Sequence, residues 1–221
     1  MMTDRDGKIW VTVDPNRCVL IIDPDSREIE RTTHLEVPDH FLAASPDGYT
    51  VCFSAKEYPV VVVDVASKQV TGRVSVPVGG QAVRVSPDGA KLCVGDFHRP
   101  LLHVIDCDSR KLLETVPLAG VPGWPFNSTD GKFVIVTTYD KPADRGYVEL
   151  LDSANVSNRR VIEVPSEPFH ALPLRDGKHA LVAHANGEMA RIDLDSATLV
   201  DGGFSAGGTM PEILLYLDAQ A

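Results

Sequence analysis

The sequence predicts an all-β fold built from five repeats of about 42 residues, and three observations carry this prediction. Asp-Gly pairs recur at nearly constant spacing. Apolar segments that end in aspartate recur in phase with them, and no stretch shows helical periodicity. All-β domains of 221 residues are common without subdivision, so we expect a single domain over residues 1–221.

The two periodic signals keep the same phase over five copies. The Asp-Gly pairs are separated by 41, 41, 42 and 46 residues, and lie at Asp6-Gly7, Asp47-Gly48, Asp88-Gly89, Asp130-Gly131 and Asp176-Gly177. The closing aspartates are separated by 41, 42, 46 and 41 residues, and are Asp23, Asp64, Asp106, Asp152 and Asp193. Agreement of two independent registers is hard to produce by chance.

Each repeat contains four short β-rich segments separated by turns. In the second repeat the segments are Phe41 to Ala44, Thr50 to Ser54, Val60 to Val65 and Gln69 to Val76. The Ser-Pro-Asp-Gly sequences that end at Gly48 and Gly89 suit a type I turn, because proline presets φ at the second position and glycine frees the fourth. An aspartate that ends the third segment, such as Asp106, can accept hydrogen bonds from the next turn.

Four strands at this period predict the blade of a β-propeller, because each small sheet must bury its faces against its neighbours. We expect five blades, formed by residues 1–36 with 207–218, 37–77, 78–119, 120–165 and 166–206. The first repeat begins after the place of its innermost strand. The segment from Gly207 to Asp218 resembles the start of a repeat, so we expect it to supply that strand and close the ring. The alternative is a piece of a larger propeller, or half of an assembled one.

Two stretches carry a resemblance to a known family. The segment from Val83 to Val94, with its Ser86-Pro87-Asp88-Gly89 turn, and the segment from Val104 to Leu112 resemble YVTN-type bacterial β-propeller repeats. The resemblance covers nearly the whole chain and implies the fold, without an activity. The last two turns depart from the pattern, since Ser128-Thr129 and Leu174-Arg175 stand where Ser-Pro is expected. A shorter similarity, from Asp6 to Thr12, is to the metal-dependent gluconolactonase and streptogramin-lyase propellers.

Charge and composition narrow the classes of partner. The net charge of −10, from 31 acidic and 21 basic residues, opposes binding to nucleic acid or to an acidic membrane surface. No apolar run reaches membrane-span length and the N-terminus lacks a signal-peptide pattern, so we expect a cytoplasmic protein. Four cysteines without a CxxC spacing do not indicate a disulfide framework, and we expect Cys52 and Cys93, at one repeat position, to be buried strand thiols.

Sorting polar residues by the two ends of the blades indicates one candidate site. The starts of the innermost strands and the loops between second and third strands emerge at one end, opposite the Asp-Gly turns. At the innermost-strand starts we place His40, Gln81, Trp124, His170 and Glu212, and in the loops we place Asp14, Asp96, His98, Tyr139 and His184. The innermost strands of a propeller line a central channel. The spacing leaves open whether Phe169 or His170 faces this channel. The extra residues of the fourth repeat, from Tyr139 to Gly146, lie at the same end.

These residue types suggest chemistry at a channel mouth. Imidazoles and carboxylates can bind a divalent metal or transfer protons near neutral pH. We expect His40, His170 and Glu212 as catalytic groups; Gln81, Trp124, Tyr139 and Asp14 as ligand-binding groups; and His98, His184 and Asp96 as metal ligands. The resulting hypothesis is a small-molecule-binding propeller, with a metal-assisted lyase, hydrolase or isomerase activity as one form. The alternative is a non-catalytic scaffold for protein–protein interaction.

Overall fold

The computed structural model describes residues 2–13, 18–34, 41–54, 59–77, 80–205 and 207. The chain divides into two compact units, Met1–Val116 and Pro117–Ala221. Throughout the described residues the regular structure is β, in five antiparallel sheets of four strands. Within those same ranges no helix is present, so none is long and apolar enough to span a membrane.

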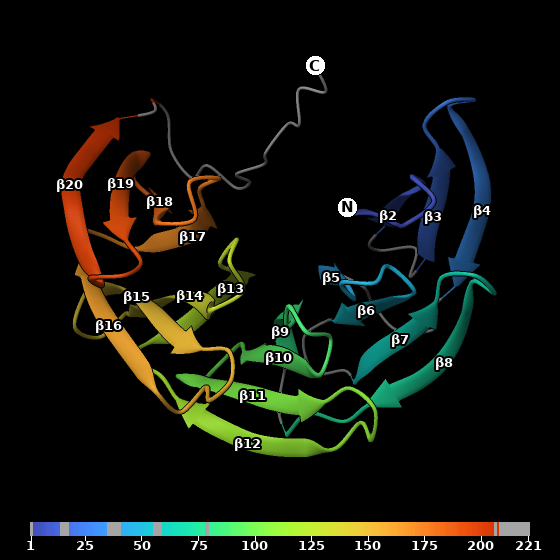
Figure 1. Ribbon diagram of the computed structural model, residues 1–221, viewed down its shortest axis with the longest axis horizontal. Helices are drawn as coiled ribbons and strands as arrows, with labels where there is room; N and C mark the ends of the chain where they lie inside the picture. Colours follow the sequence, from blue (N-terminus) through green and yellow to red (C-terminus); the bar gives the residue numbers. More distant parts are fainter. Residues whose placement is uncertain are drawn as a thin grey trace. The chain divides into compact units, whose positions relative to one another are not determined.

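The first unit holds three sheets whose strands follow chain order from one edge to the other (Figure 1). The first sheet is β1 (Met2–Thr3), β2 (Ile9–Val13), β3 (Cys18–Asp23) and β4 (Glu28–His34). The second is β5 (Phe41–Ala44), β6 (Thr50–Ser54), β7 (Val60–Asp64) and β8 (Gln69–Val74). The third is β9 (Gly80–Val85), β10 (Lys91–Asp96), β11 (Leu101–Asp106) and β12 (Leu112–Pro117), whose last residue belongs to the second unit.

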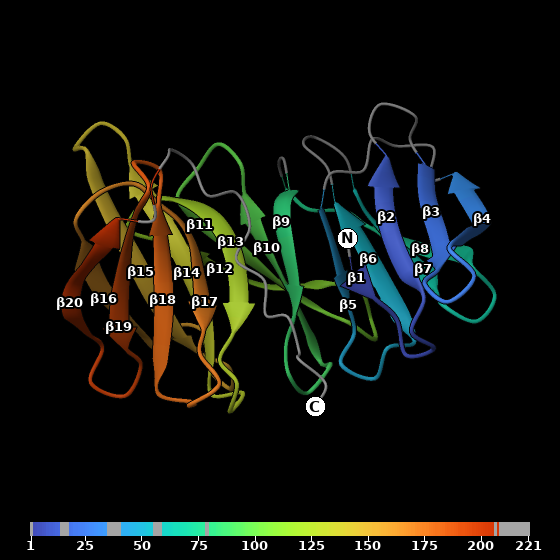
Figure 2. The ribbon, with the colours of Figure 1, turned by 90° about the horizontal axis from the view of Figure 1, so that it is seen from above.

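The second unit holds two further sheets with the same simple meander (Figure 2). One is β13 (Val121–Asn127), β14 (Phe133–Asp140), β15 (Arg145–Asp152) and β16 (Arg159–Val164). The other is β17 (Pro168–Pro173), β18 (His179–His184), β19 (Glu188–Asp193) and β20 (Thr198–Ser205). The four strands predicted for the second repeat are confirmed, with β7 and β8 ending one and two residues earlier than expected.

The Asp-Gly pairs form the predicted turns between first and second strands. In the second sheet the Gly48 amide donates to the Ser45 carbonyl at 2.9 Å, and the Tyr49 amide donates to Asp47 Oδ1 at 3.0 Å. Gly48 has a φ of +71°, a conformation in which a residue with Cβ is strained. The divergent turn at Gly177 keeps this geometry, because its amide donates to the Leu174 carbonyl at 3.2 Å.

Apolar side chains on facing sheets form the cores within each unit. In the first unit one cluster joins the first two sheets through residues such as Trp10 and Phe53, and another joins the second and third sheets through residues such as Val62 and Leu92. In the second unit Ile135 and Leu150 pack with Val182 of the facing sheet. The middle strands of the second and third sheets are buried on both faces. This explains why their sequences are apolar runs rather than alternating patterns.

One feature, at the start of the chain, differs from the expectations. The place beside β2 is taken by the two-residue strand β1, in which Met2 pairs with Trp10. The segment expected to supply that strand, 207–218, lies outside the described residues apart from Gly207. The extra residues of the fourth repeat lengthen the β14–β15 hairpin, since both strands have eight residues and only four residues connect them.

Candidate functional site

Three innermost strands carry a bulge at the same place. In the ladders, Gly80 lies opposite Asp96, Pro122 opposite Thr138 and Pro168 opposite His184. The register then shifts within the next two residues of β9, β13 and β17. Bulges of this kind change the direction of a side chain and are frequent beside functional sites.

The strand pairing of β9, β13 and β17 shows which residues of the three strands occupy equivalent positions. This alignment differs from the one expected from the sequence spacing. Trp124 and His170 occupy one position, two residues after the paired Pro122 and Pro168. The matching residue of the third sheet is Ala82, because Gln81 follows Gly80 directly and corresponds to Phe169. Gln81 was expected at the position equivalent to Trp124 and His170. The structure places it one residue earlier in its strand, because of a bulge that the sequence spacing does not reveal.

His170 is the best-defined member of the candidate site. Its side chain is 4% exposed, and its ring lies 4.2 Å from the Trp124 ring at an interplanar angle of 37°. Phe126 and Phe169 approach the same imidazole edge-on, with centroids 6.0 and 5.7 Å away. His170 rather than Phe169 is therefore buried within the aromatic cluster, while Trp124 and Phe169 stay partly exposed.

The environment of His170 keeps its imidazole neutral and leaves one nitrogen without a partner. Burial lowers the pKa of His170 to about 4, so the ring carries no charge near pH 7. Its Nδ1 is buried and makes no hydrogen bond with any described residue. An unpaired buried polar atom costs about 1–3 kcal/mol, so this arrangement calls for an explanation other than stability.

The position of the aromatic cluster depends on a close approach of β13 to β17. Thr137 Oγ1 donates to the Phe169 carbonyl at 3.1 Å. A Cβ at Gly123 would lie 2.5 Å from that Thr137 oxygen and 3.2 Å from the Phe169 carbonyl oxygen. Glycine is therefore required at position 123 for the two bulges to meet.

His184 lies at the same end of the β17–β18 pair and is completely buried. Its Nδ1 donates to the Ser166 carbonyl at 3.2 Å, because a carbonyl oxygen can only accept; the lone pair is therefore on Nε2. This Nε2 has no partner among the described residues. Burial lowers the pKa of His184, against the opposing effect of the Ser166 hydrogen bond.

Asp96 occupies the matching place in the third sheet, but its oxygens are already bonded. Oδ1 accepts from the His98 and Arg99 amides at 2.9 and 3.0 Å, and Oδ2 accepts from Arg99 Nε and Nη2 at 2.9 and 2.7 Å. Burial alone would raise the pKa of Asp96, but the Arg99 and amide hydrogen bonds hold it below its usual range. His103 Nε2 lies 3.4 Å from the same Oδ2.

Two buried polar residues in third strands were not singled out as site residues from the sequence. His103 faces Val94 in its ladder, and Glu149 faces the corresponding Val136. Glu149 accepts from the Ala119 amide at 2.7 Å, from Thr138 Oγ1 at 3.0 Å and from Arg159. Both residues interrupt apolar strand segments, and this interruption is the sequence signal that could have identified them as buried polar residues. Their hydrogen-bond partners give both a structural role.

The other predicted residues fall into three groups. Tyr139 donates to Asp144 Oδ1 at 2.6 Å within the β14–β15 hairpin, and this bond raises the pKa of Tyr139 to about 12. His98 is exposed in the loop after β10. Asp14, His40 and Glu212 lie outside the described residues.

The predicted metal site gains no geometric support within the ranges given above. In that part of the chain no group of three or more His, Cys, Asp or Glu side chains is placed to hold an ion. Of the three predicted ligands, Asp96 uses both carboxylate oxygens within its own loop, and His184 has one unpartnered nitrogen.

Comparison with solved structures identifies the architecture. The chain is similar to Kuenenia stuttgartiensis hydrazine synthase, with a TM-score of 0.76 and 21% identity, over 86% of this chain and 61% of that one. It is also similar to the dihydro-heme d1 dehydrogenase NirN in complex with DHE, with a TM-score of 0.71 and 18% identity, over 95% of this chain and 46% of that one.

The fold is a β-propeller. Its five four-stranded sheets are the blades of that architecture, as the repeats predicted. The chain spans about three fifths and just under half of the two matched chains, and identities this low establish the fold alone. No protein-family model matches the chain, and no curated protein matches it in sequence.

Proposed function

We propose that this propeller binds a small planar polar molecule at the innermost strands β13 and β17. The observation that carries the proposal is His170, a buried neutral imidazole whose Nδ1 has no partner among the described residues. A ligand that donates to or accepts from this nitrogen would remove the cost of leaving it unpaired.

The rings around His170 favour a flat ligand. Trp124 and Phe169 lie 5.8 Å apart, centroid to centroid, and both are partly exposed, so they offer apolar surface beside the polar atom. Aromatic surface with one oriented hydrogen-bonding group is typical of small-molecule sites. The NirN neighbour, whose structure is a complex with DHE, is consistent with ligand binding on this fold.

Binding fits His170 better than acid–base catalysis. A general base works best when its pKa lies near the operating pH, and a pKa of about 4 leaves His170 a weak base at neutral pH. We therefore assign His170 a hydrogen-bonding role in place of the proton-transfer role expected from the sequence. The metal-assisted form of the hypothesis would need donors outside the described residues.

The test is titration with nicotinamide, a planar probe that can donate and accept hydrogen bonds. The chain has two tryptophans, so two indole N–H resonances report on binding. We expect the chemical shift of the Trp124 indole N–H to change with nicotinamide concentration and to reach a plateau. The Trp10 indole N–H should not change, because it donates a hydrogen bond to Asp4. His170→Phe should weaken binding at least tenfold while keeping the ring stack.

A matched control is available in the neighbouring strand of the same sheet. His179 lies at the other end of β18, where its Nδ1 is 2.7 Å from Asp176 Oδ2. His179→Gln should leave nicotinamide affinity unchanged. Equal loss of affinity in both variants, or retained affinity in His170→Phe, would contradict the proposal.

A scaffold role is the second candidate, and β20 is the feature that favours it. This strand is the outer edge of its sheet and exposes Leu199, Val200 and Phe204, the last to 61%. Its register shifts twice and Gly203 has a φ of +82°, so a partner would contact these exposed side chains rather than add a strand to the bent edge. If β20 binds a second copy, sedimentation will show concentration-dependent association that Phe204→Lys abolishes.

A further inference from the structure

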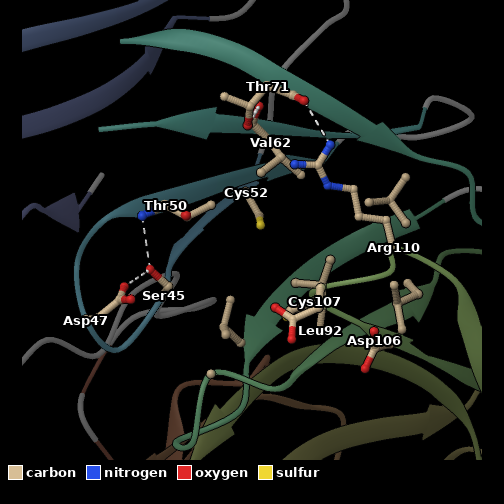
Figure 3. A pocket seen from close by; sticks show the side chains of 15 residues that line it. Ser45, Asp47, Thr50, Cys52, Val62, Thr71, Leu92, Asp106, Cys107 and Arg110 are labelled. Atoms are coloured by element: carbon tan, nitrogen blue, oxygen red, sulfur yellow. Dashed lines mark hydrogen bonds between the residues drawn. The ribbon is translucent and has the colours of Figure 1, made fainter. Parts of the chain in front are cut away.

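A second candidate site lies in the first unit, at the turn end of its second and third sheets. There the structure contains a cavity of about 220 Å³ between the sheet β5–β8 and the sheet β9–β12. Figure 3 shows the Cys52 sulfur pointing into this space and Arg110 reaching over it. No residue of the cavity belongs to the candidate site described above.

The deep part of the cavity is apolar, and the cavity is large enough for an aromatic ring. Its deep surface comes from Val62, Val85, Leu92 and Ile105, all part of one core. An engineered apolar cavity of ~150 Å³ accepts benzene, so this volume has room for a ring and a short substituent. The Cys52 thiol is buried and makes no hydrogen bond with a described residue, and burial raises its pKa to about 12, so it lines the wall as a neutral group.

The mouth of the cavity is acidic. Asp47, Asp106 and Asp108 contribute three carboxylates against the single guanidinium of Arg110. Asp47 and Asp106 each use Oδ1 to accept hydrogen bonds within their turns, from Tyr49 and Ser109 respectively. Ser109 also hydrogen-bonds to Asp106 through its side chain, and the charge of Arg5 acts on Asp47. Asp108 is exposed at its turn and is therefore the carboxylate most available to a cation.

Arg110 is fixed across the mouth rather than directed at these carboxylates. Its Nη1 donates to the Thr71 carbonyl at 2.8 Å on the neighbouring sheet. A Cβ at Gly72 would lie 1.7 Å from that nitrogen, so glycine is needed for the guanidinium to take this position. The guanidinium among the lining residues is thus held by the backbone, and three lining carboxylates remain at the opening.

We propose that this cavity binds a small arylalkylamine, with the ring against the valine and leucine wall and the ammonium group at the carboxylates. Apolar burial and charge complementarity act at different ends of the same ligand. The proposal is independent of the nicotinamide site, since it concerns other sheets and a cationic rather than a neutral ligand.

The experiment is methyl NMR of the full chain with three probes of one shape. We expect benzylamine to shift the methyl resonances of Val62, Val85 and Leu92 with saturation at millimolar concentration. Neutral benzyl alcohol should bind about fivefold more weakly, and benzoate should not bind. Equal binding of the alcohol, preferential binding of benzoate, or no methyl shift with benzylamine would each overturn the proposal.

Two variants locate the site. Cys52→Met places a longer side chain in the cavity and should abolish the shifts, with the remaining methyl spectrum showing that the fold is intact. Asp108→Asn, at an exposed turn position, should weaken benzylamine about threefold. Asp25→Asn is the control, because Asp25 occupies the same turn position in the first sheet, away from the cavity. Equal weakening by the control would overturn the assignment of the ammonium to this mouth.

Discussion

His103 and His170 are buried histidines of the third and fifth repeats, but their surroundings differ in one decisive respect. His103 is 1% exposed, and both of its ring nitrogens have partners, with Nδ1 3.0 Å from Thr115 Oγ1 and Nε2 3.4 Å from Asp96 Oδ2. His170 is 4% exposed and has apolar rings around it and an unpartnered Nδ1. Burial alone therefore does not distinguish a structural histidine from a binding one, whereas hydrogen-bond satisfaction does.

The largest expected effect is at the carboxylate that supports His103. Asp96→Ala removes the acceptor of Arg99 and of two loop amides, and it leaves His103 facing a gap. We expect a loss of about 3 kcal/mol in the free energy of unfolding, measured by urea denaturation. Nicotinamide affinity should not change. A loss below about 1 kcal/mol would show that the Asp96 network is not the structural element we describe.

A smaller effect is expected from replacing His103 itself. His103→Phe keeps an aromatic ring but leaves Asp96 Oδ2 and Thr115 Oγ1 without this partner. We expect destabilisation by about 2 kcal/mol, from unpaired polar groups and a larger ring in a packed strand. Thermal and urea unfolding of the variant measure this cost directly.

The pH dependence of stability should report on His170. Unfolding returns His170 from a pKa of about 4 to its ordinary value of 6.5, so between these pH values the unfolded chain binds more protons. The titration of His170 therefore does not reduce the free energy of unfolding above pH 6.5. Below pH 6.5 it lowers the free energy of unfolding progressively as the pH falls toward 4.

The size of that loss can be bounded. The full difference in pKa corresponds to at most about 3 kcal/mol, and remaining water contact reduces the expected loss to about 2 kcal/mol. The comparison is between wild type and His170→Phe from pH 7 to pH 4.5, which cancels the titration of carboxylates. Parallel curves for the two proteins would contradict the assignment of a lowered pKa to His170.

The smallest expected effect on stability is that of His170→Phe at neutral pH. The substitution removes an unpaired nitrogen and keeps a ring against Trp124, so we expect a change within about 1 kcal/mol, in the stabilising direction. Loss of nicotinamide binding without loss of stability is typical of a residue kept for function. Destabilisation as large as that of His103→Phe would instead make His170 a structural residue.

The repeats and turns of this chain were predictable because they depend on local chemistry. Aspartate and glycine at a fixed offset specify the turn at Gly48, and the same signal holds where Leu174 replaces the usual serine. The two buried strand thiols, Cys52 and Cys93, were likewise predictable from their repeat position.

The site was only partly predictable, because it depends on contacts between repeats and on strand register. His170 and Trp124 were named from the sequence, and the structure brings their rings together. The bulges that shift Gln81 by one position leave no spacing signal. The partners that occupy Asp96 come from its own loop and from β11, and these hydrogen bonds appear only in three dimensions.

The central claim is that His170 Nδ1 is a ligand-binding atom, and the most direct measurement is the ring ¹⁵N spectrum of the histidines during nicotinamide titration. The account predicts a saturable shift of the His170 Nδ1 resonance, with the His103 ring nitrogens unchanged because their partners are already in place. An unchanged His170 resonance at saturating probe, or shifts of His103 equal to those of His170, would contradict it.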